Sequence, residues 1–460
     1  MMESNTKDKS GTAVLVVTTI GSFLMILALS AVNVALPSIS RELAMNAVSV
    51  GWVALAFTLS TGMFLVPLGK LADMWGRTTI FIAGNWIFTV ASFLLAIASA
   101  PWMVIALRAV QGLGCAMFFV TVLAILVAAY PLEQRGKVLG IHVASTYFGL
   151  SMGPFMGGML TQNFGWRSIF FINVPIGLMV AFLSMRKLPR HTKERKTGNF
   201  DTTGSLIYIV TLFSVLYGFS LVPKFISTVF VGAGLLGAVI FVWWEKNTNH
   251  PVLDLSIFTK NPVFTLSNAA ALINYAAIYA VAFLLSFYLQ HIKGLSPQKA
   301  GLILVCQPVM QAILSPLMGR LSDKIEPRIL ASLGMAVTAV SLFVLAFLSP
   351  QTTFVSVIIT LSMLGTGVAL FSSPNINAIM SSAGDHLHSV ASSMVATART
   401  LGQILSMGIA MIAFAVFIGQ LQISPPLYVA LLRAVRTSFI VFGVLCTAGV
   451  FASLVRGNIR

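Results

Sequence analysis

Long charge-free stretches limit what this chain can fold into more than any other feature. Five such stretches, without any Asp, Glu, Lys or Arg, are long enough to matter. They lie between Lys9 and Arg41, Glu42 and Lys70, Lys137 and Arg167, Lys260 and Lys293, and Arg399 and Arg433. Each holds the roughly 20 apolar residues that a helix needs to cross a bilayer. Charged residues make up only 9% of the 460 positions, against about 25% in soluble chains, which argues against a large soluble enzyme.

The spanning segments are expected to be helices, because hydrocarbon cannot satisfy free backbone polar groups and the alternation typical of a β-barrel is missing from the sequence. Breaking the chain at charges, prolines and polar clusters predicts an all-α integral membrane protein with about 14 transmembrane helices. Their predicted starts lie near residues 13, 48, 79, 102, 138, 168, 203, 226, 264, 300, 328, 353, 390 and 433. Residues 420–432 leave room for a short interfacial helix.

The basic residues are distributed unevenly between the two sides of the predicted membrane. Of the 28 Lys and Arg residues, 19 fall on the side of the N-terminus, seven on the opposite side, and two, Arg108 and Arg399, within spans. This bias predicts a multi-pass protein of the cell membrane with both termini in the cytoplasm. It also accounts for the net charge of +16 without nucleic acid. The densest basic run, residues 186–196, is then a topology anchor near anionic lipid.

One charged loop occurs twice in this apolar chain. "GKLADMWGR" at residues 69–77 follows the second predicted span, and "GRLSDK" at residues 319–324 repeats it 250 residues later. Both copies follow an even-numbered span on the predicted inner side, so the two halves are parallel repeats. Asp73 and Arg77 are four residues apart, a spacing that allows them to pair or to cap helix ends. The candidate functional residues of the two loops are Gly69, Asp73, Gly76, Arg77, Gly319 and Asp323.

The spacing of the two loops also predicts the domain organisation. Eight predicted spans separate the copies, whereas a doubled six-span unit needs six, so two spans are extra. The natural candidates are the seventh and eighth, which follow the basic linker. We expect two six-helix pseudo-repeat bundles plus two extra linker helices. The predicted domains are an N-terminal bundle in residues 1–186, a basic cytoplasmic linker with the extra helices and the following loop in 187–262, and a C-terminal bundle in 263–460.

Several segments resemble the major facilitator superfamily. The loop at residues 69–77 resembles its loop motif, and "RAVQGLG" at 108–114 its fourth-span motif. "GLSMGPFMGG" at 149–158 matches a fifth-span motif of exporters. "NVALPSI" at 33–39 and "INVPIG" at 172–177 resemble the fourteen-span drug:proton antiporter-2 branch. The resemblance implies a secondary active exporter of small amphipathic organic compounds that works by alternating access, with the proton as coupling ion and with no cofactor. It also implies that the contacts of Asp73 and Arg77 hold one closed or open state, which makes the residues of the two loops candidate gate residues; the alternative is a structural turn with an ion pair.

The fifth-span motif has a physical meaning of its own. Gly149, Gly153 and Gly157 recur every fourth residue and form a stripe without side chains that lets another helix approach closely. Pro154 removes a backbone hydrogen bond and weakens the helix there. Together with Gly158, these residues predict a helix that rocks between two packings during transport, and the alternative is a static packing seam.

The charged residues within the predicted spans differ from those common in the family that the chain resembles. The family commonly carries an acid in the first span, and this chain has Ala28 at that position. No Asp or Glu lies deep in any predicted span, whereas Arg108 and Arg399 do. Intramembrane cations are costly and usually face a cavity or a partner. The alternative is that both arginines bond backbone carbonyls or polar side chains such as Asn33 and Gln111.

These residues lead to a charge hypothesis for the transport cavity. The candidates for the cavity or for coupling are Arg108, Gln111, Asn33, His142 and Arg399. A fixed positive charge without the usual acid favours anionic or neutral amphiphiles over cationic drugs. A lone histidine such as His142 is more often a packing residue than a proton carrier. The sequence therefore leaves proton coupling open.

Other functions find less support in the sequence. An exporter of anionic or neutral metabolites with atypical or no proton coupling is the main alternative. A membrane enzyme would need a titratable or metal cluster near one interface, and the His and Cys residues show no metal-ligand spacing. A sensor or scaffold on a transporter fold would be favoured by long soluble tails. We expect a monomer in the lipid bilayer that binds a small organic substrate.

Overall fold

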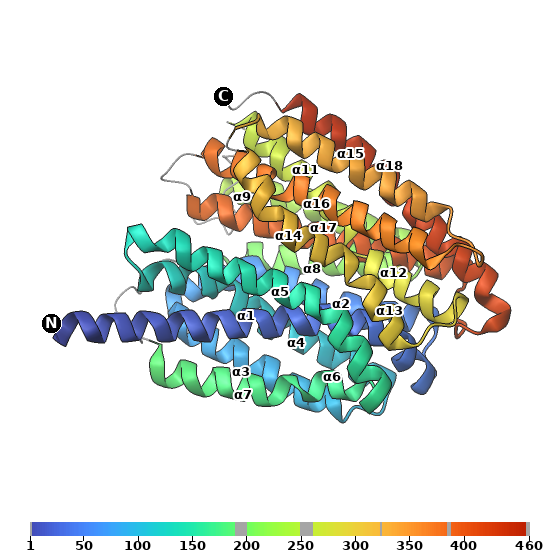
Figure 1. Ribbon diagram of the computed structural model, residues 1–460, viewed down its shortest axis with the longest axis horizontal. Coiled ribbons are helices and arrows are strands. Elements are labelled where there is room, and N and C mark those ends of the chain that lie inside the picture. Colours follow the sequence, from blue (N-terminus) through green and yellow to red (C-terminus); the bar gives the residue numbers. More distant parts are fainter. Residues whose placement is uncertain (1, 189–199, 249–260, 323, 384–387, 457–460) are drawn as a thin grey trace.

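The structure is a computed structural model that describes residues 2–188, 200–248, 261–322, 324–383 and 388–456. Every regular element within these ranges is a helix (Figure 1). The predicted gate residue Asp323 and most of the basic run at 186–196 lie outside the described residues.

The first seven helices form the N-terminal bundle. They are α1 (Met2–Glu42), α2 (Ala47–Trp75), α3 (Arg77–Ala96), α4 (Pro101–Ala129), α5 (Leu132–Phe164), α6 (Arg167–Phe171) and α7 (Asn173–Lys187). Helix α1 packs on α5, α4 packs on both α2 and α3, and α7 packs on α3 and α1. The predicted sixth span is therefore built from two helices, α6 and α7, which meet at Ile172.

Two further helices lie between the bundles in sequence. Helices α8 (Thr202–Ser220) and α9 (Phe225–Asn247) pack against each other, and α8 also contacts α2 and α17. Tyr208 of α8 donates a hydrogen bond to the carbonyl oxygen of Gly62 in α2 at 3.1 Å. Helix α9 is exposed along most of its apolar length, as expected for an extra helix on the lipid-facing side.

The remaining helices form the C-terminal bundle. They are α11 (Pro262–Ile278), α12 (Val281–Phe287), the π-helix η1 (Tyr288–Ile292), α13 (Pro297–Leu304), α14 (Cys306–Ser322), α15 (Pro327–Ala346), α16 (Phe354–Ala383), α17 (His388–Phe417), the 3-10 turn η3 (Pro425–Leu427) and α18 (Tyr428–Val455). The interfacial helix that residues 420–432 left room for does not form. Because η3 runs directly into α18, this segment is the start of the last span.

The predicted number of spans agrees with the helices observed. Thirteen helical segments among the described residues are long and apolar enough to cross a membrane. Helix α5 is 33 residues long and is less apolar because glycine, hydroxyl residues and His142 occupy many of its positions. Counting α5 gives the expected 14 membrane helices.

Matching close contacts relate the two bundles. A Cβ atom added at Gly84 would lie 2.8 Å from the carbonyl oxygen of Gly114, where α3 crosses α4. At Gly367 a Cβ atom would lie 2.9 Å from the carbonyl oxygen of Gly334, where α15 crosses α16. Gly334 follows Gly84 by the same 250 residues that separate the two loops. The two halves therefore repeat their helix crossings as well as their loops.

The bundles meet most closely at one end. We call the end where α1 begins and α18 ends the terminus end, and the opposite one the far end. At the far end the Gln290 amide donates to the carbonyl oxygen of Val34 at 2.8 Å, and Asn46 donates to Gln420 at 2.8 Å. Toward the terminus end the helices of the two bundles diverge (Figure 1).

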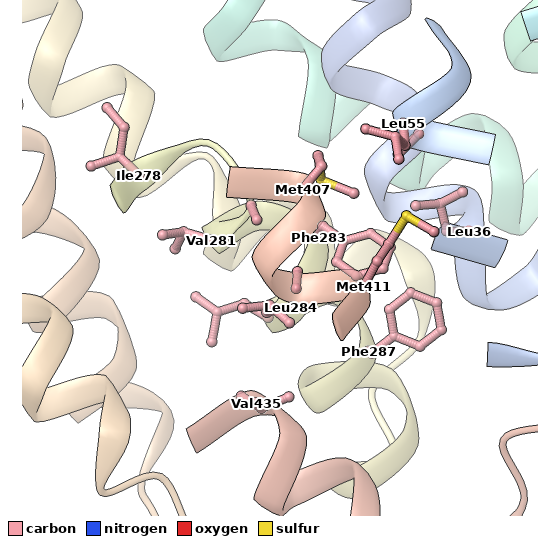
Figure 2. Close-up of a cluster of buried hydrophobic side chains, with 14 of the residues drawn as sticks. Leu36, Leu55, Ile278, Val281, Phe283, Leu284, Phe287, Met407, Met411 and Val435 are labelled. Atoms are coloured by element: carbon pink, nitrogen blue, oxygen red, sulfur yellow. The ribbon is translucent and has the colours of Figure 1, made fainter. Parts of the chain in front are cut away.

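An apolar cluster fills the space between the bundles on the far-end side. Figure 2 shows Met407 and Met411 of α17 beside Phe283 and Phe287 of α12, with Leu36 and Leu55 of the N-terminal bundle approaching them. All six side chains are buried. The close packing of these side chains excludes water, so the cluster closes the far end of the bundle interface.

The seam between α5 and α1 generates the first prediction. A Cβ atom at Gly153 would lie 2.6 Å from the hydroxyl oxygen of Ser30, so a side chain there would force the two helices apart. We expect Gly153→Leu to destabilise the N-terminal bundle by about 1–3 kcal/mol or more. The thermal unfolding of purified protein in detergent measures this. An unchanged midpoint would show that α1 does not constrain this face of α5.

Candidate functional site

Polar side chains gather where the two bundles meet halfway along their helices. The hydroxyl groups of Thr58 in α2 and Tyr279, which follows α11, lie 3.0 Å apart and share a hydrogen bond. The half-buried Arg399 of α17 lies over the ring of Tyr275 at 5.9 Å. Arg399 also interacts electrostatically with Tyr279. We call Thr58, Tyr275, Tyr279 and Arg399 the interface site.

Arg108 forms its hydrogen bonds inside the N-terminal bundle, although its charge also interacts with Tyr279 of the interface site. Its guanidinium donates to the carbonyl oxygen of Val53 at 3.0 Å and to the Gln111 amide oxygen at 2.6 Å, and it lies over the Phe57 ring at 4.3 Å. Gln111 in turn donates to Ser92 at 2.8 Å. Arg108 is only 1% exposed. The structure therefore favours the alternative of a bonded arginine and does not place Arg108 in an open cavity.

The other two candidates do not join Arg108. Asn33 is half-buried on α1, and its side chain is not among the partners of the Arg108 guanidinium. His142 is 5% exposed, and its Nδ1 atom lies 3.5 Å from the Ser22 hydroxyl of α1. His142 is thus a packing contact between α5 and α1 in this arrangement.

Ala28 shows why the first span needs no charge here. It is 1% exposed and belongs to an apolar cluster with Phe57 and Phe118. Glu42, at the far end of the same helix, binds Arg167 and accepts a hydrogen bond of 2.8 Å from the Trp166 indole. It therefore does not turn inward to neutralise an arginine of the bundle.

The first charged loop is compact and exposed. Arg77 pairs with Asp73 at 2.8 Å, and both side chains are 45% exposed. Gly76 has a φ of 97° and joins α2 to α3, a conformation that favours glycine. A Cβ atom at Gly69 would meet no atom within 4 Å, and one at Gly319 would meet only Ser373, at 3.8 Å. The space beside Gly69 and Gly319 thus leaves room for another element to approach.

Neighbouring glycines of α5 face different bundles. Gly149, Gly153 and Gly157 lie against α1 of their own bundle. A Cβ atom at Gly158 would instead clash with the backbone of Pro297 in α13, across the bundle interface. Gly301 of α13 approaches the backbone of Pro154 in the same way. The stripe is thus an internal packing seam, and the crossing between bundles involves Pro154, Gly158 and Gly301.

Comparison with known protein families identifies the family of this chain. The family model described as Major Facilitator Superfamily matches residues 18–407, with a second match over residues 269–458.

The chain belongs to the major facilitator superfamily.

Proteins similar to this chain include several that are named for drug resistance. The Multidrug resistance protein Stp of Mycobacterium tuberculosis is 30% identical over 401 residues, which cover 86% of this chain and 74% of that protein. The Methylenomycin A resistance protein of Bacillus subtilis is 30% identical over 409 residues, 87% of each chain. The Riboflavin transporter RibZ of Clostridioides difficile is 31% identical over 389 residues, 84% of this chain and 85% of that one. The chain is therefore a membrane transporter of this superfamily and not an enzyme.

Solved structures support the fold. A crystal structure of a peptide transporter POT aligns with a TM-score of 0.70 at 14% identity, covering 96% of this chain and 97% of that one. A bacterial homologue of the human lysosomal transporter Spinster aligns with a TM-score of 0.66 at 16% identity, covering 97% and 96%.

Three of the four interface-site residues could not be predicted as functional from the sequence. Thr58, Tyr275 and Tyr279 carry no charge and belong to no motif, so only Arg399 stood out. A usable signal is the polar side chain in an apolar span, and that signal is shared by many Thr and Tyr residues that only pack.

The bundle crossing generates the second prediction. Gly158→Leu would strain only the state in which the far end is closed, by about 1–3 kcal/mol, which lowers the population of that state by about 5- to 150-fold. We expect it to reduce transport strongly while the protein still folds.

Gly140→Leu is the matched control, because a Cβ atom at Gly140 of the same helix meets no atom within 4 Å. It should transport normally. Equal transport by Gly158→Leu and Gly140→Leu would show that the crossing does not limit transport.

Proposed function

We propose that the protein is a secondary active exporter of small amphipathic organic compounds that works by alternating access. Relatives named for multidrug and methylenomycin A resistance support export. The apolar closure at the far end and the divergence of the bundles toward the terminus end support a two-state gate. With the terminus end in the cytoplasm, as the basic residues predict, this arrangement receives substrate from the cytoplasm.

The interface site carries the proposal about substrate charge. Arg399 brings a permanent positive charge to a site that Tyr275 and Tyr279 line with aromatic rings and hydroxyl groups. Every carboxylate residue in the described part of the chain lies in a loop or near a helix end, so none of these faces Arg399 from the middle of a span. Such a site favours anionic or neutral amphiphiles, because a cation would meet repulsion with no compensating acid.

The coupling ion follows less directly from the structure. A proton antiporter needs a group that gains and loses a proton during the cycle. Ala28 replaces the acid common in the family, and His142 is packed against Ser22. Our proposal is therefore export with the proton as coupling ion through a group other than these two, with uncoupled or atypically coupled export as its alternative.

A second candidate function is export of anionic or neutral metabolites. It is favoured by the same positive interface site and by a relative named for riboflavin transport. The two candidates share the fold and the gate, and they differ in the natural substrate and in the expected coupling to protons.

The Arg399 charge generates the third prediction. Arg399→Gln should reduce export of an anionic amphiphile by about tenfold or more, the effect of losing about 1.4 kcal/mol of binding, and should change export of a neutral one little. Export is measured in cells that lack their own exporters, with an anionic, a neutral and a quaternary ammonium dye. Arg399→Lys tests whether the charge alone suffices.

Arg433→Gln is the matched control, since Arg433 is exposed at the far end of α18. It should leave all three substrates unaffected. If the wild type exports the quaternary ammonium dye well and the anionic dye not at all, the positive-site proposal fails and the usual cationic multidrug exporter is correct. Substrate-induced proton movement in reconstituted vesicles tests coupling separately.

The exposed loop pair generates the fourth prediction. An exposed ion pair at this spacing contributes only about 0.3–0.5 kcal/mol to stability, so Asp73→Asn should leave the folded protein intact. We expect it nevertheless to reduce transport strongly, since the loop lies at the predicted cytoplasmic gate. Asp323→Asn should act in the same direction. Full transport by correctly inserted Asp73→Asn would show that the loop is only a turn.

A further inference from the structure

Arg456 is a buried cation at the terminus end of the C-terminal bundle. It follows the last residue of α18 and is 2% exposed. Its Nη1 group donates to the Asn375 side-chain oxygen of α16 at 2.6 Å and to the Ser267 hydroxyl of α11 at 3.3 Å. Asn375 also donates to the carbonyl oxygen of Ser267 at 3.0 Å. Arg456 thus joins three helices through one of its nitrogen atoms.

The other edge of the same guanidinium has no protein partner. Its Nε and Nη2 atoms are buried and form no hydrogen bond within the described part of the chain. These two N–H groups point in parallel, the arrangement that binds two oxygens of one carboxylate or phosphate group. An unsatisfied buried donor costs about 1–3 kcal/mol, and more when it is charged. The edge therefore favours an anion as its ligand.

Among the described residues, charges of both signs act on Arg456. Burial lowers its pKa to about 10, so it stays positively charged at neutral pH. Glu326 and Arg328, near the start of α15, interact electrostatically with Arg456 in opposite directions. The Glu326 effect is the larger of the two and offsets part of the Arg456 charge, but it leaves the Nε and Nη2 donors without a hydrogen bond.

The N-terminal bundle shows that this polar site is not needed to close a bundle of this kind. From the matched glycine crossings, the counterpart of Asn375 on α16 is Val122 on α4. The residue that follows the last helix there is Leu188. Val122 and Leu188 are buried in one apolar cluster. The C-terminal bundle thus carries a buried charge where its counterpart packs with apolar side chains.

The position of Arg456 along the membrane suggests which anion can reach it. The preceding residues Leu454 and Val455 are apolar and 47% and 74% exposed, as expected of side chains that face lipid. Arg456 lies one residue beyond the last candidate span, Pro425–Val455, where we expect the headgroup phosphates to begin. Basic pockets between helices on the cytoplasmic side are known to bind anionic headgroups.

We propose that Arg456, Asn375 and Ser267 form an anion site that binds a phosphate group through the Nε and Nη2 edge of Arg456. The phosphate comes from an anionic phospholipid headgroup or from free phosphate. The site lies in one bundle and is independent of the proposed export function, so either proposal can fail without the other.

The test measures the thermal unfolding midpoint of the purified full-length protein in two arms. In neutral detergent, sodium phosphate is compared with sodium gluconate at equal ionic strength. In lipid nanodiscs, phosphatidylcholine is compared with phosphatidylcholine that contains phosphatidylglycerol. A bound ligand should raise the midpoint by about 2 °C for each tenfold rise in its concentration above the dissociation constant. A rise in the first arm identifies free phosphate, and a rise in the second arm alone identifies the headgroup.

Two variants tie the effect to Arg456. Arg456→Gln should abolish the rise, and Arg328→Gln, which removes a neighbouring charge but leaves the donor edge, should keep it. If Arg456→Gln does not fold, Arg456→Lys replaces it, because lysine keeps the charge and lacks the paired donors. No rise for the wild type in either arm, or a full rise in Arg456→Gln or Arg456→Lys, overturns the proposal.

Discussion

Close contact between helix backbones is the constraint on which the rest of this structure depends. Apolar side chains do not drive helices together in lipid, so association needs dense packing. Helix α5 achieves this twice, against α1 through Gly149, Gly153 and Gly157 and against α13 through Gly158. The first contact lies within a bundle and the second lies between bundles. One helix thereby connects the stability of the N-terminal bundle to the closure of the far end.

The distribution of polar groups follows from the same packing. At the far end, apolar side chains such as Phe283 and Met411 fill the space between the bundles in this closed arrangement. Halfway along the interface, Thr58 and Tyr279 form one hydrogen bond, which is easily exchanged for water when the bundles separate. Arg108, by contrast, is held by Val53 and Gln111 inside one bundle. Groups that would be costly to expose are thus kept away from the surface that moves.

The sequence predicts the spans well because charged side chains are costly in hydrocarbon and therefore separate the spans. Most helices begin within a few residues of the predicted starts. The sequence does not predict the π-helix Tyr288–Ile292 or the two-part sixth span, since these depend on packing around otherwise regular apolar segments. The faces of α5 are also not predicted: Gly157 and Gly158 are neighbours in sequence but point about 100° apart, and only the neighbouring helices decide that one meets α1 and the other α13.

The two buried arginines show how differently the two bundles use a cation. Arg108 bonds a backbone carbonyl and an amide and lies over an aromatic ring, so its charge is stabilised by groups of its own bundle. Arg456 uses one nitrogen for Asn375 and Ser267 and leaves a paired edge without a protein partner. A guanidinium whose charge is stabilised by protein groups holds the helices in one arrangement. A guanidinium with donors that lack a protein partner holds them well only when an anion is bound. The rigidity of the C-terminal bundle at its terminus end would then depend on the surrounding lipid or solution, while that of the N-terminal bundle would not.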